Sequence, residues 1–422
     1  MYGYRTGYSV PARPRPQSFA PGTITDLRFD VGRYRLNGGT VSTSTIDGYH
    51  TRSSSRWAER ADGSWQEFVT NAAAIMPQRG YDAREGHTVL NPNPLNPRAW
   101  TLVGGSATDE AGTFLGFSSA RRVTSEGGSS HRIRDDVTGG IVSGQTYALR
   151  ALYAGTGRFR AGVRQDANTS ILTGNVGALS SGSSALGSFS AIENINRGGG
   201  IYEVRAILTA SATVNVTVEV GPDSATTGAD VVVIAAQIVQ RGYQMPFGRG
   251  TVAADTMVVP AAAAGMAVNP AASGLTMFWR GRDYPSAAGF PRSMEIRIDG
   301  SNRLSFERRM SDGVARPAFA GLAGASTALS FGTLEQLPYG SEYAALATWR
   351  PDGTVWLRAT GVAASTGSGR TMMVGTPATI GIGCSGNLSD RLNSTTRRCG
   401  LMPHSLSDGD ALALFNQINE GL

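Results

Sequence analysis

The sequence contains no lysine, so all 38 of its basic residues are arginine, against 32 acidic residues. Total loss of lysine fits a GC-rich coding genome better than a task that needs arginine. The arginines are scattered, with adjacent pairs at most, whereas nucleic-acid binders cluster mixed basic residues in runs. We therefore expect no nucleic-acid partner despite the formal charge of +6.

Long apolar runs, histidine and cysteine are also scarce. No stretch approaches 18 consecutive apolar residues, so we expect no membrane insertion. The first 19 residues have arginines without a following apolar segment, and a signal peptide is not expected. The four histidines stand far apart, so neither a metal site nor a cofactor is predicted. Two interpretations of Cys384 and Cys399 stay open, one disulfide or two free thiols.

Glycine is abundant, with 55 of 422 residues, and it punctuates many short runs that alternate between apolar and polar residues. The period of two predicts strands, as in Val214 to Val220 and Tyr202 to Leu208. Asp62-Gly63 between two such runs predicts a hairpin. Tryptophans within these runs are expected in the core. Many short strands with one buried face favour antiparallel β-sandwiches.

The composition changes along the chain, and these changes suggest four segments. Prolines and asparagines from Asn91 to Pro97 indicate a linker, and alanine and proline dominate Val258 to Ala272. One helix is expected near the end, capped by Ser407. Its buried face would hold Ala411, Leu414, Phe415 and Ile418. We predict an extended arm at 1–25, a small β-rich region at 26–90, a β-sandwich at 91–250 and a second sandwich at 251–422.

The arm is rich in tyrosine, arginine and proline, which cannot build a core of their own. It is either a solvated tail or a segment that docks on another subunit, and its tyrosines favour docking. The residues predicted to attach it are Tyr2, Tyr4, Arg5, Tyr8, Arg13 and Arg15.

Taken in order, the segments after residue 25 resemble modular virion proteins of tailed phages and gene-transfer agents. Leu27-Arg28-Phe29 resembles their opening, and Gly144-Gln145-Thr146-Tyr147 a core strand of a carbohydrate-binding-module-like jelly roll. Ala347-Thr348-Trp349 with Asp352-Gly353 resembles paired strands of a concanavalin-like lectin/laminin-G domain. The resemblance implies an all-β fold with an N-terminal arm, a small β region, a jelly roll and a concanavalin-like sandwich that carries the C-terminal helix.

Catalytic sets are not found, so we expect no enzyme. Glu295 and Asp299 share a strand face, but Arg297 between them favours an ion-paired surface over a general acid. Sugar binding needs an aromatic face with planar donors and acceptors. Arg282, Asp283 and Tyr284 supply these in a predicted loop, although an ordinary sandwich loop with a half-buried Tyr284 remains the alternative.

The resemblance implies a fibre, spike or decoration of a virion, on head or tail, that displays β-sandwiches for adsorption to host glycans. Its partners would be other virion proteins, through the arm, and host cell-surface polysaccharide. It would be a homotrimer on the particle surface, assembled in the host cytoplasm. A purely architectural component is the first alternative, and a polysaccharide depolymerase is the second.

Overall fold

The structure is a computed structural model, and it describes residues 22–128, 131–223, 226–287, 290–311, 314–323, 325–330, 335–368, 373–384 and 393–420. It is 52% strand and 7% helix, so the predicted all-β class is confirmed. The attachment residues of the arm lie outside the described residues. No helix of the described part is long and apolar enough to cross a membrane.

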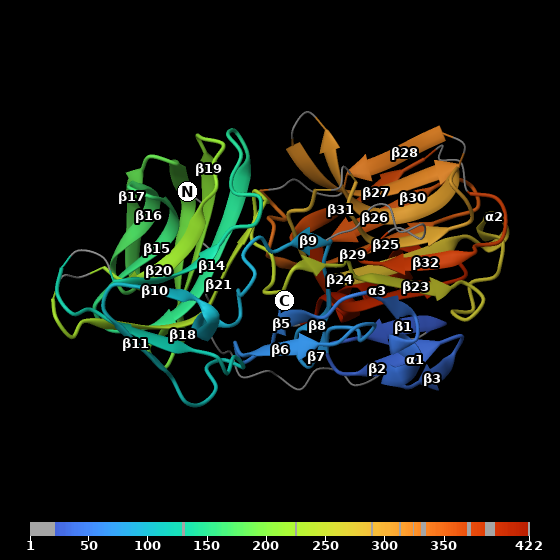
Figure 1. The fold of residues 1–422 in the computed structure, drawn as a ribbon. Coiled ribbons are helices and arrows are strands. Elements are labelled where there is room, and N and C mark those ends of the chain that lie inside the picture. The colour runs from blue at the N-terminus through green and yellow to red at the C-terminus, as the bar shows by residue number, and fades with distance from the viewer. Residues whose placement is uncertain are drawn as a thin grey trace. The chain divides into compact units, whose positions relative to one another are not determined.

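The chain forms two compact units (Figure 1). Unit 1 contains the described residues of 1–50, 75–84 and 256–422, and unit 2 those of 51–74 and 85–255. Residues 26–90, expected as one small β region, are therefore divided between the units, because their strands pair with different sheets. The expected arm also ends too late, since Thr25 already opens the first strand of unit 1.

Unit 2 is a jelly-roll-like sandwich of two six-stranded antiparallel sheets. The first sheet has the order β10 (Thr101–Val103), β13 (Arg132–Asp136), β20 (Thr217–Pro222), β15 (Arg158–Gln165), β16 (Asn168–Asn175), β17 (Ala178–Ser184). The second has the order β11 (Ser106–Asp109), β12 (Arg121–Thr124), β21 (Asp230–Val239), β14 (Thr146–Ala154), β19 (Ile201–Ala210), β18 (Gly187–Gly198). Phe159 and Val218 of the first sheet share one core with Tyr147 and Val231 of the second.

Three smaller elements complete unit 2: the hairpin β5 (Arg56–Glu59) and β6 (Trp65–Phe68), the pair β9 (His87–Thr88) and β22 (Thr251–Val252), and the 3-10 turn η1 (Pro97–Ala99). The hairpin is the one predicted from Asp62-Gly63. The expected linker is not a loose connection. Asn91 is fully buried, and its amide donates to Asp135 and to the carbonyl of Ala236.

Unit 1 is a larger antiparallel sandwich. Its ten-stranded sheet has the order β3 (Gly39–Val41), β2 (Arg33–Leu36), β1 (Thr25–Arg28), β33 (Asn393–Met402), β24 (Leu275–Tyr284), β29 (Glu342–Trp349), β30 (Val355–Ala359), β31 (Val362–Gly367), with β8 (Gly80–Ala83) on β33 and β7 (Ile75–Met76) on β8. Its seven-stranded sheet has the order β28 (Ala325–Ser330), β27 (Val314–Ala323), β26 (Asn302–Ser311), β25 (Arg292–Arg297), β32 (Thr379–Ile382), β23 (Thr256–Pro260), β4 (His50–Thr51).

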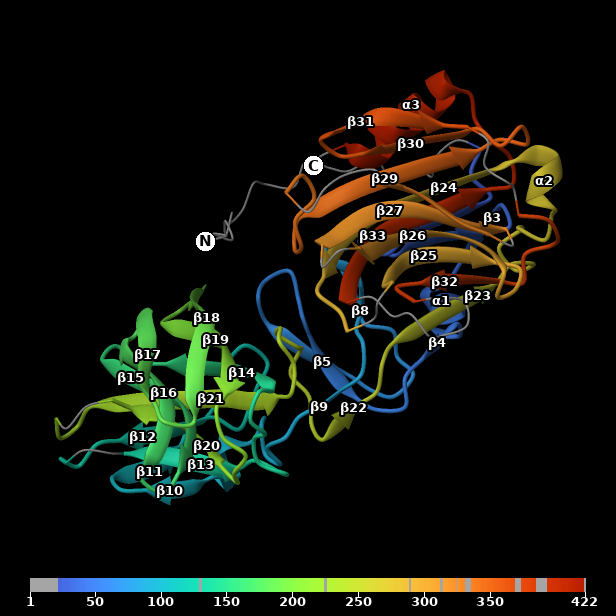
Figure 2. The same cartoon turned by 90° about the horizontal axis from the view of Figure 1, so that it is seen from above.

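The helices of unit 1 are α1 (Thr43–Asp47), α2 (Pro270–Ser273) and α3 (Asp408–Asn419). The predicted C-terminal helix is confirmed as α3, with Ser407 accepting a hydrogen bond from the Asp410 amide. Its predicted apolar face packs on Phe278 and Leu346 of the ten-stranded sheet, and Figure 2 shows the helix beside β29 and β30.

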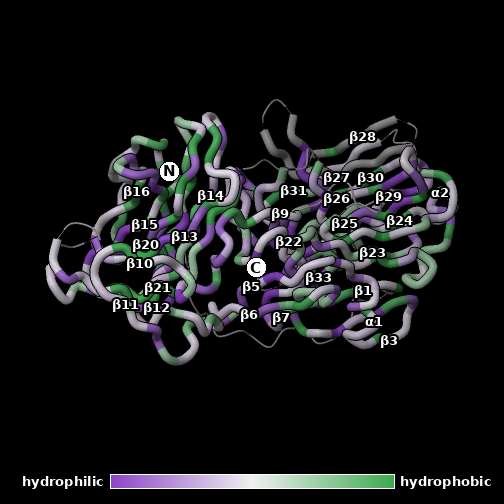
Figure 3. Tube along the Cα trace, viewed as in Figure 1, coloured by the Kyte–Doolittle hydropathy of each residue, from purple (hydrophilic) through white to green (hydrophobic). Residues whose placement is uncertain are grey.

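Figure 3 shows hydrophilic and hydrophobic residues mixed along the strands of each unit, as one-sided burial requires. Trp65, Trp279, Trp349 and Trp356 are buried as expected, at 4% exposure or less. Trp57 is partly buried and stacks on Phe117, with ring centroids 4.5 Å apart.

Candidate functional site

One face of unit 2 gathers arginines around a single buried carboxylate. Glu219, on β20, is fully buried, and its two oxygens take ion pairs from three arginines of the adjacent strands. The Nε of Arg132 lies 2.6 Å from Oε2, and the Nε of Arg164 lies 3.3 Å from the same oxygen. Arg160 pairs with Oε1 through Nη2. We call this surface, made by β13, β20 and β15, the Glu219 face.

The alternation of the sequence produces this face. In β15, Phe159, Ala161 and Val163 are fully buried in the sandwich core, so the residues between them point away from it. These outward positions are Arg158, Arg160, Gly162 and Arg164. In β13, the core residue Ile133 lies between Arg132 and Arg134 in the same way.

Sheet register brings the arginines of the Glu219 face together. Glu219 stands opposite Gly162 on one neighbouring strand and opposite Arg134 on the other. Gly162 has no side chain, so Arg160 and Arg164 can approach the carboxylate from the two sides of that position. A Cβ at residue 162 would lie 2.2 Å from the carbonyl oxygen of Ser170, so the position requires glycine.

The electrostatics of the face are dominated by positive charge. Burial lowers the pKa of Arg132; Glu219 counters that shift, and Arg164, Arg160 and Arg134 add to it. Arg132 and Arg160 form the floor, with side chains 7% exposed, whereas Arg164 is 17% exposed and Arg134 is exposed. Three guanidinium groups therefore pair with one carboxylate, and the more accessible Arg134 and Arg164 belong to the two strands that flank β20.

Unit 1 contains a similar arrangement on its seven-stranded sheet. Glu295 of β25 is fully buried, and its carboxylate lies 2.6 Å from Arg292, 3.6 Å from Arg297 and 3.8 Å from Arg303. Asp299 does not share this site. It is a turn residue whose pKa is lowered mainly by the amide of Ser301, 2.7 Å away, and by the side chain of Asn302. The two carboxylates therefore do not form an acid–base pair.

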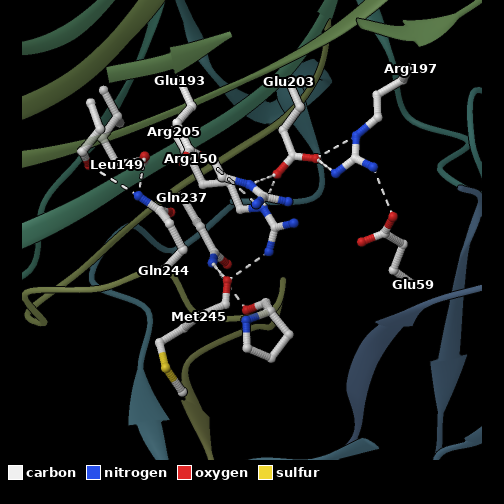
Figure 4. A network of polar contacts seen from close by, with 12 residues as sticks. Glu59, Leu149, Arg150, Glu193, Arg197, Glu203, Arg205, Gln237, Gln244 and Met245 are labelled. Carbon is white, nitrogen blue, oxygen red and sulfur yellow. Dashed lines mark hydrogen bonds and ion pairs between the residues drawn. The ribbon is translucent and has the colours of Figure 1, made fainter. Parts of the chain in front are cut away.

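A third network, around Glu203 on β19, has a structural role (Figure 4). Arg150, Arg197 and Arg205 all pair with its carboxylate, and Arg197 also reaches Glu59 at 2.8 Å. Burial alone would raise the pKa of Glu203, but the arginines together hold it well below its ordinary value. The network fastens the β5–β6 hairpin to β18 and β19.

Arg150 of this network is fully enclosed. Its guanidinium lies 4.5 Å from the ring centroid of Trp65 and 4.7 Å from that of Phe247, and it donates to the carbonyl of Met245. Burial lowers the pKa of Arg150 to about 10. Because these groups are satisfied by one another, the Glu203 network is not a candidate binding surface.

The predicted loop at Arg282, Asp283 and Tyr284 is the end of strand β24, so the expectation of a loop is wrong. Strand alternation turns Asp283 inward, where it is fully buried and forms a two-pronged ion pair with Arg308 at 2.6 and 2.8 Å. Arg282 is exposed, and Tyr284 is half-buried with the Arg84 guanidinium 4.5 Å from its ring centroid. Asp283 is therefore held by the core, away from the surface.

The cysteines are two buried free thiols, so the disulfide alternative is wrong. Cys399 is on β33 of the ten-stranded sheet, and Cys384 follows β32 of the other sheet. Burial raises the pKa of Cys399 well above its ordinary value. Among the described residues, no group of three or more His, Cys, Asp or Glu side chains could hold a metal ion.

The even spacing of Arg158, Arg160 and Arg164, in steps of two and four residues, is the sequence signal for the Glu219 face. Counting the arginines as scattered residues overlooks it, because residues two apart in a strand share one face. Arg132 and Arg134 repeat that spacing on a second strand.

Comparisons with known proteins do not assign a family. No family model matches the chain, and no curated protein matches it. A leech intramolecular trans-sialidase is 10% identical, with a TM-score of 0.27, over 34% of this chain and 23% of its own. A SAP-like pentraxin from Limulus polyphemus is 16% identical, with a TM-score of 0.26, over 33% and 68%. Mouse laminin α1 domains LG4–5 are 9% identical, with a TM-score of 0.26, over 72% and 95%.

The chain thus spans less than a quarter of the trans-sialidase. Similarities with such low identities and TM-scores give no information about the function of this chain. The structure itself defines the class as an all-β protein with two β-sandwich units.

Proposed function

We propose that this chain is a structural virion protein, a fibre, spike or decoration of a tailed-phage or gene-transfer-agent particle, whose sandwiches bind host surface glycans. The Glu219 face is the observation that carries the glycan-binding part. It presents planar, fixed hydrogen-bond donors on a rigid sheet, held in place by the ion pairs to Glu219. Glycan hydroxyl and carboxyl groups are acceptors for such donors.

Retention of the purified protein on host-cell polysaccharide tests glycan binding. Arg134→Gln with Arg164→Gln should reduce the retained fraction, because both side chains lie on the accessible sides of the face. Arg249→Gln, an exposed arginine of the same unit outside this face, is the matched control. Equal retention of all variants would remove the Glu219 face from the function. Release of reducing ends during the assay would favour a depolymerase.

A second contact on unit 1 is part of the proposal. Arg282 and Tyr284 lie together at the end of β24, the first exposed and the second half-buried. Tyr284→Ala should weaken adsorption of particles while changing the melting temperature little. A large fall in melting temperature would instead assign Tyr284 to the core.

Attachment to the particle is proposed to use the N-terminal arm, and the chain is proposed to be a homotrimer. The described fold starts before residue 25, so the clean deletion removes residues 1–21 and keeps β1 (Thr25–Arg28) intact. This truncated protein should fold and fail to join particles, as measured by mass spectrometry of purified particles. A monomeric mass of the full chain in light scattering would contradict the trimer.

A further inference from the structure

The Glu219 face has an excess of cationic donors that its own carboxylate cannot satisfy. Arg132, Arg160 and Arg164 share the two oxygens of Glu219, and Arg134 stands directly opposite it on β13. Each guanidinium has five N–H donors, about twenty for four arginines, whereas a carboxylate accepts about four hydrogen bonds. Most of these donors must therefore bond to something other than Glu219.

The other carboxylates near these strands do not compensate the excess. Asp223 is paired with Arg158 at 2.7 Å, at the opposite end of β15 from Arg164. Asp136 lies on the same outward side of β13 as Arg134, but it is exposed and forms no ion pair among the described residues. The Nε of Arg160 is buried and has no hydrogen-bond partner among the described residues. The face thus holds a net positive charge in a partly dry setting, where charges interact more strongly than in water.

The outward positions of the same sheet contain no aromatic residue in the described part. Register places Thr169, Ile171 and Thr173 of β16 beside the arginines of β15, and Thr217 beside Glu219 on β20. Among its described residues, the face therefore lacks the aromatic ring on which the C–H groups of a neutral sugar stack, and also the rings on which single-stranded nucleic acids stack their bases. A ligand of this face must therefore bind mainly through ion pairs with the arginines.

We infer that the Glu219 face binds an acidic glycan, with sugar carboxylates seated on the guanidinium groups of Arg134 and Arg164. This inference rests on the proposed glycan-binding function and names its ligand class. Arginine presents a planar fork that matches a carboxylate with two parallel hydrogen bonds. The two arginines lie on the strands that flank β20, about 10 Å apart by strand spacing. One acidic chain can therefore contact both while it crosses Glu219.

The test uses the full chain and two polymers that share a backbone, polygalacturonate and its highly methyl-esterified form. We expect retention by polygalacturonate at least tenfold tighter than by the ester, and a decline of that binding with added salt. Arg134→Gln and Arg164→Gln should each weaken polygalacturonate binding by about tenfold, or 1.4 kcal/mol. Arg249→Gln should leave it unchanged, and melting curves confirm that each variant is folded.

The outcomes separate this inference from the proposed function. Equal binding of both polymers would overturn the acidic ligand class and leave glycan recognition standing. Binding of neither polymer, nor of any host polysaccharide, would overturn both. If the protein binds dextran sulfate more tightly than polygalacturonate, the acidic group that the face recognises is a sulfate, and the carboxylate assignment is wrong. If the protein binds single- or double-stranded DNA more tightly than polygalacturonate at equal ionic strength, the ligand of the face is a nucleic acid, and the glycan assignment is wrong.

Discussion

Glu219 and Gly162 face each other across the β20–β15 pair, and the missing side chain of Gly162 leaves room for two arginines to reach one carboxylate. The glycine is fixed by the backbone as well, because a Cβ there would lie 2.2 Å from the Ser170 carbonyl oxygen. Close packing of β15 on β16 and the arrangement of charge above the sheet therefore depend on one residue.

Gly162→Ala should consequently destabilise unit 2 and disturb the Glu219 face together. The added methyl group must push β15 away from β16, at a cost of about 1–3 kcal/mol for an overpacked site. Urea unfolding measures the loss, and polygalacturonate binding measures the disturbance. Gly144→Ala is not a suitable control because Gly144 has φ +80. Gly157→Ala is suitable, since nothing lies within 4 Å of its Cβ position and it precedes the same strand.

Glu219→Gln should lower the stability of unit 2 in a manner that anions reverse. The change removes the one charge that compensates three buried or half-buried arginines, and breaking such a network costs about 3–5 kcal/mol. Sulfate can supply the missing negative charge, whereas chloride at equal ionic strength cannot form two parallel hydrogen bonds. The melting temperature of the variant should therefore rise more in sulfate than that of the wild type. If sulfate raises the melting temperatures of the variant and of the wild type equally, the arginines of the variant do not bind sulfate in place of the lost carboxylate.

Asp283→Asn should destabilise unit 1, because it leaves Arg308 buried without its counter-charge. Arg308 is 1% exposed, and the Tyr343 hydroxyl also donates to Asp283 at 3.0 Å. We expect a loss of about 3–5 kcal/mol. The double variant Asp283→Leu/Arg308→Met should lose much less, since neither partner then remains as an unpaired charge. Calorimetry of the single and double variants provides the comparison, and equal losses would contradict the ion pair.

His87 should make unit 2 less stable as the pH falls from 6.5. Burial lowers the pKa of His87 to about 3, against about 6.5 in an unfolded chain. Between these values the unfolded chain binds one more proton than the folded chain, so the free energy of unfolding decreases as the pH falls. The slope approaches about 1.4 kcal/mol per pH unit well below pH 6.5.

The measurement is the urea midpoint of the full chain at pH 7, 6 and 5, for the wild type and for His87→Leu. The carboxylate of Glu203, whose pKa is lowered, contributes stability that is lost only below its ordinary pKa of about 4.5. Its effect therefore falls outside this window. The variant should show the shallower pH dependence, and parallel curves would count against a neutral buried His87.

Local patterns predict much of this fold from the sequence. The cap at Ser407 and the spacing of Ala411, Leu414, Phe415 and Ile418 define α3, because both signals lie within one segment. Strand partners are different, since they depend on residues far away. Asp26 of β1 pairs with Arg398 of β33, 372 residues later, and no local pattern indicates that β1 belongs to unit 1.

For the candidate site, too, the sequence predicts the local features but not the contacts between distant strands. Alternation in β15 places Arg160 and Arg164 on one face, which the sequence alone permits one to predict. The position of Glu219 between those arginines and Arg132 depends on the strand order β13–β20–β15, which is non-local. For Asp283 the local pattern is misleading. It indicates a polar loop, whereas Asp283 is buried and pairs with Arg308 on the other sheet.

The most direct test of the account is a crystal structure of the full chain with an oligomer of galacturonic acid. We predict its carboxylates within hydrogen-bond distance of the guanidinium groups of Arg134 and Arg164, with the sugar chain lying across Glu219. An oligomer bound elsewhere, for example against Arg282 and Tyr284 or over Glu295, with the Glu219 face unoccupied, would contradict the account.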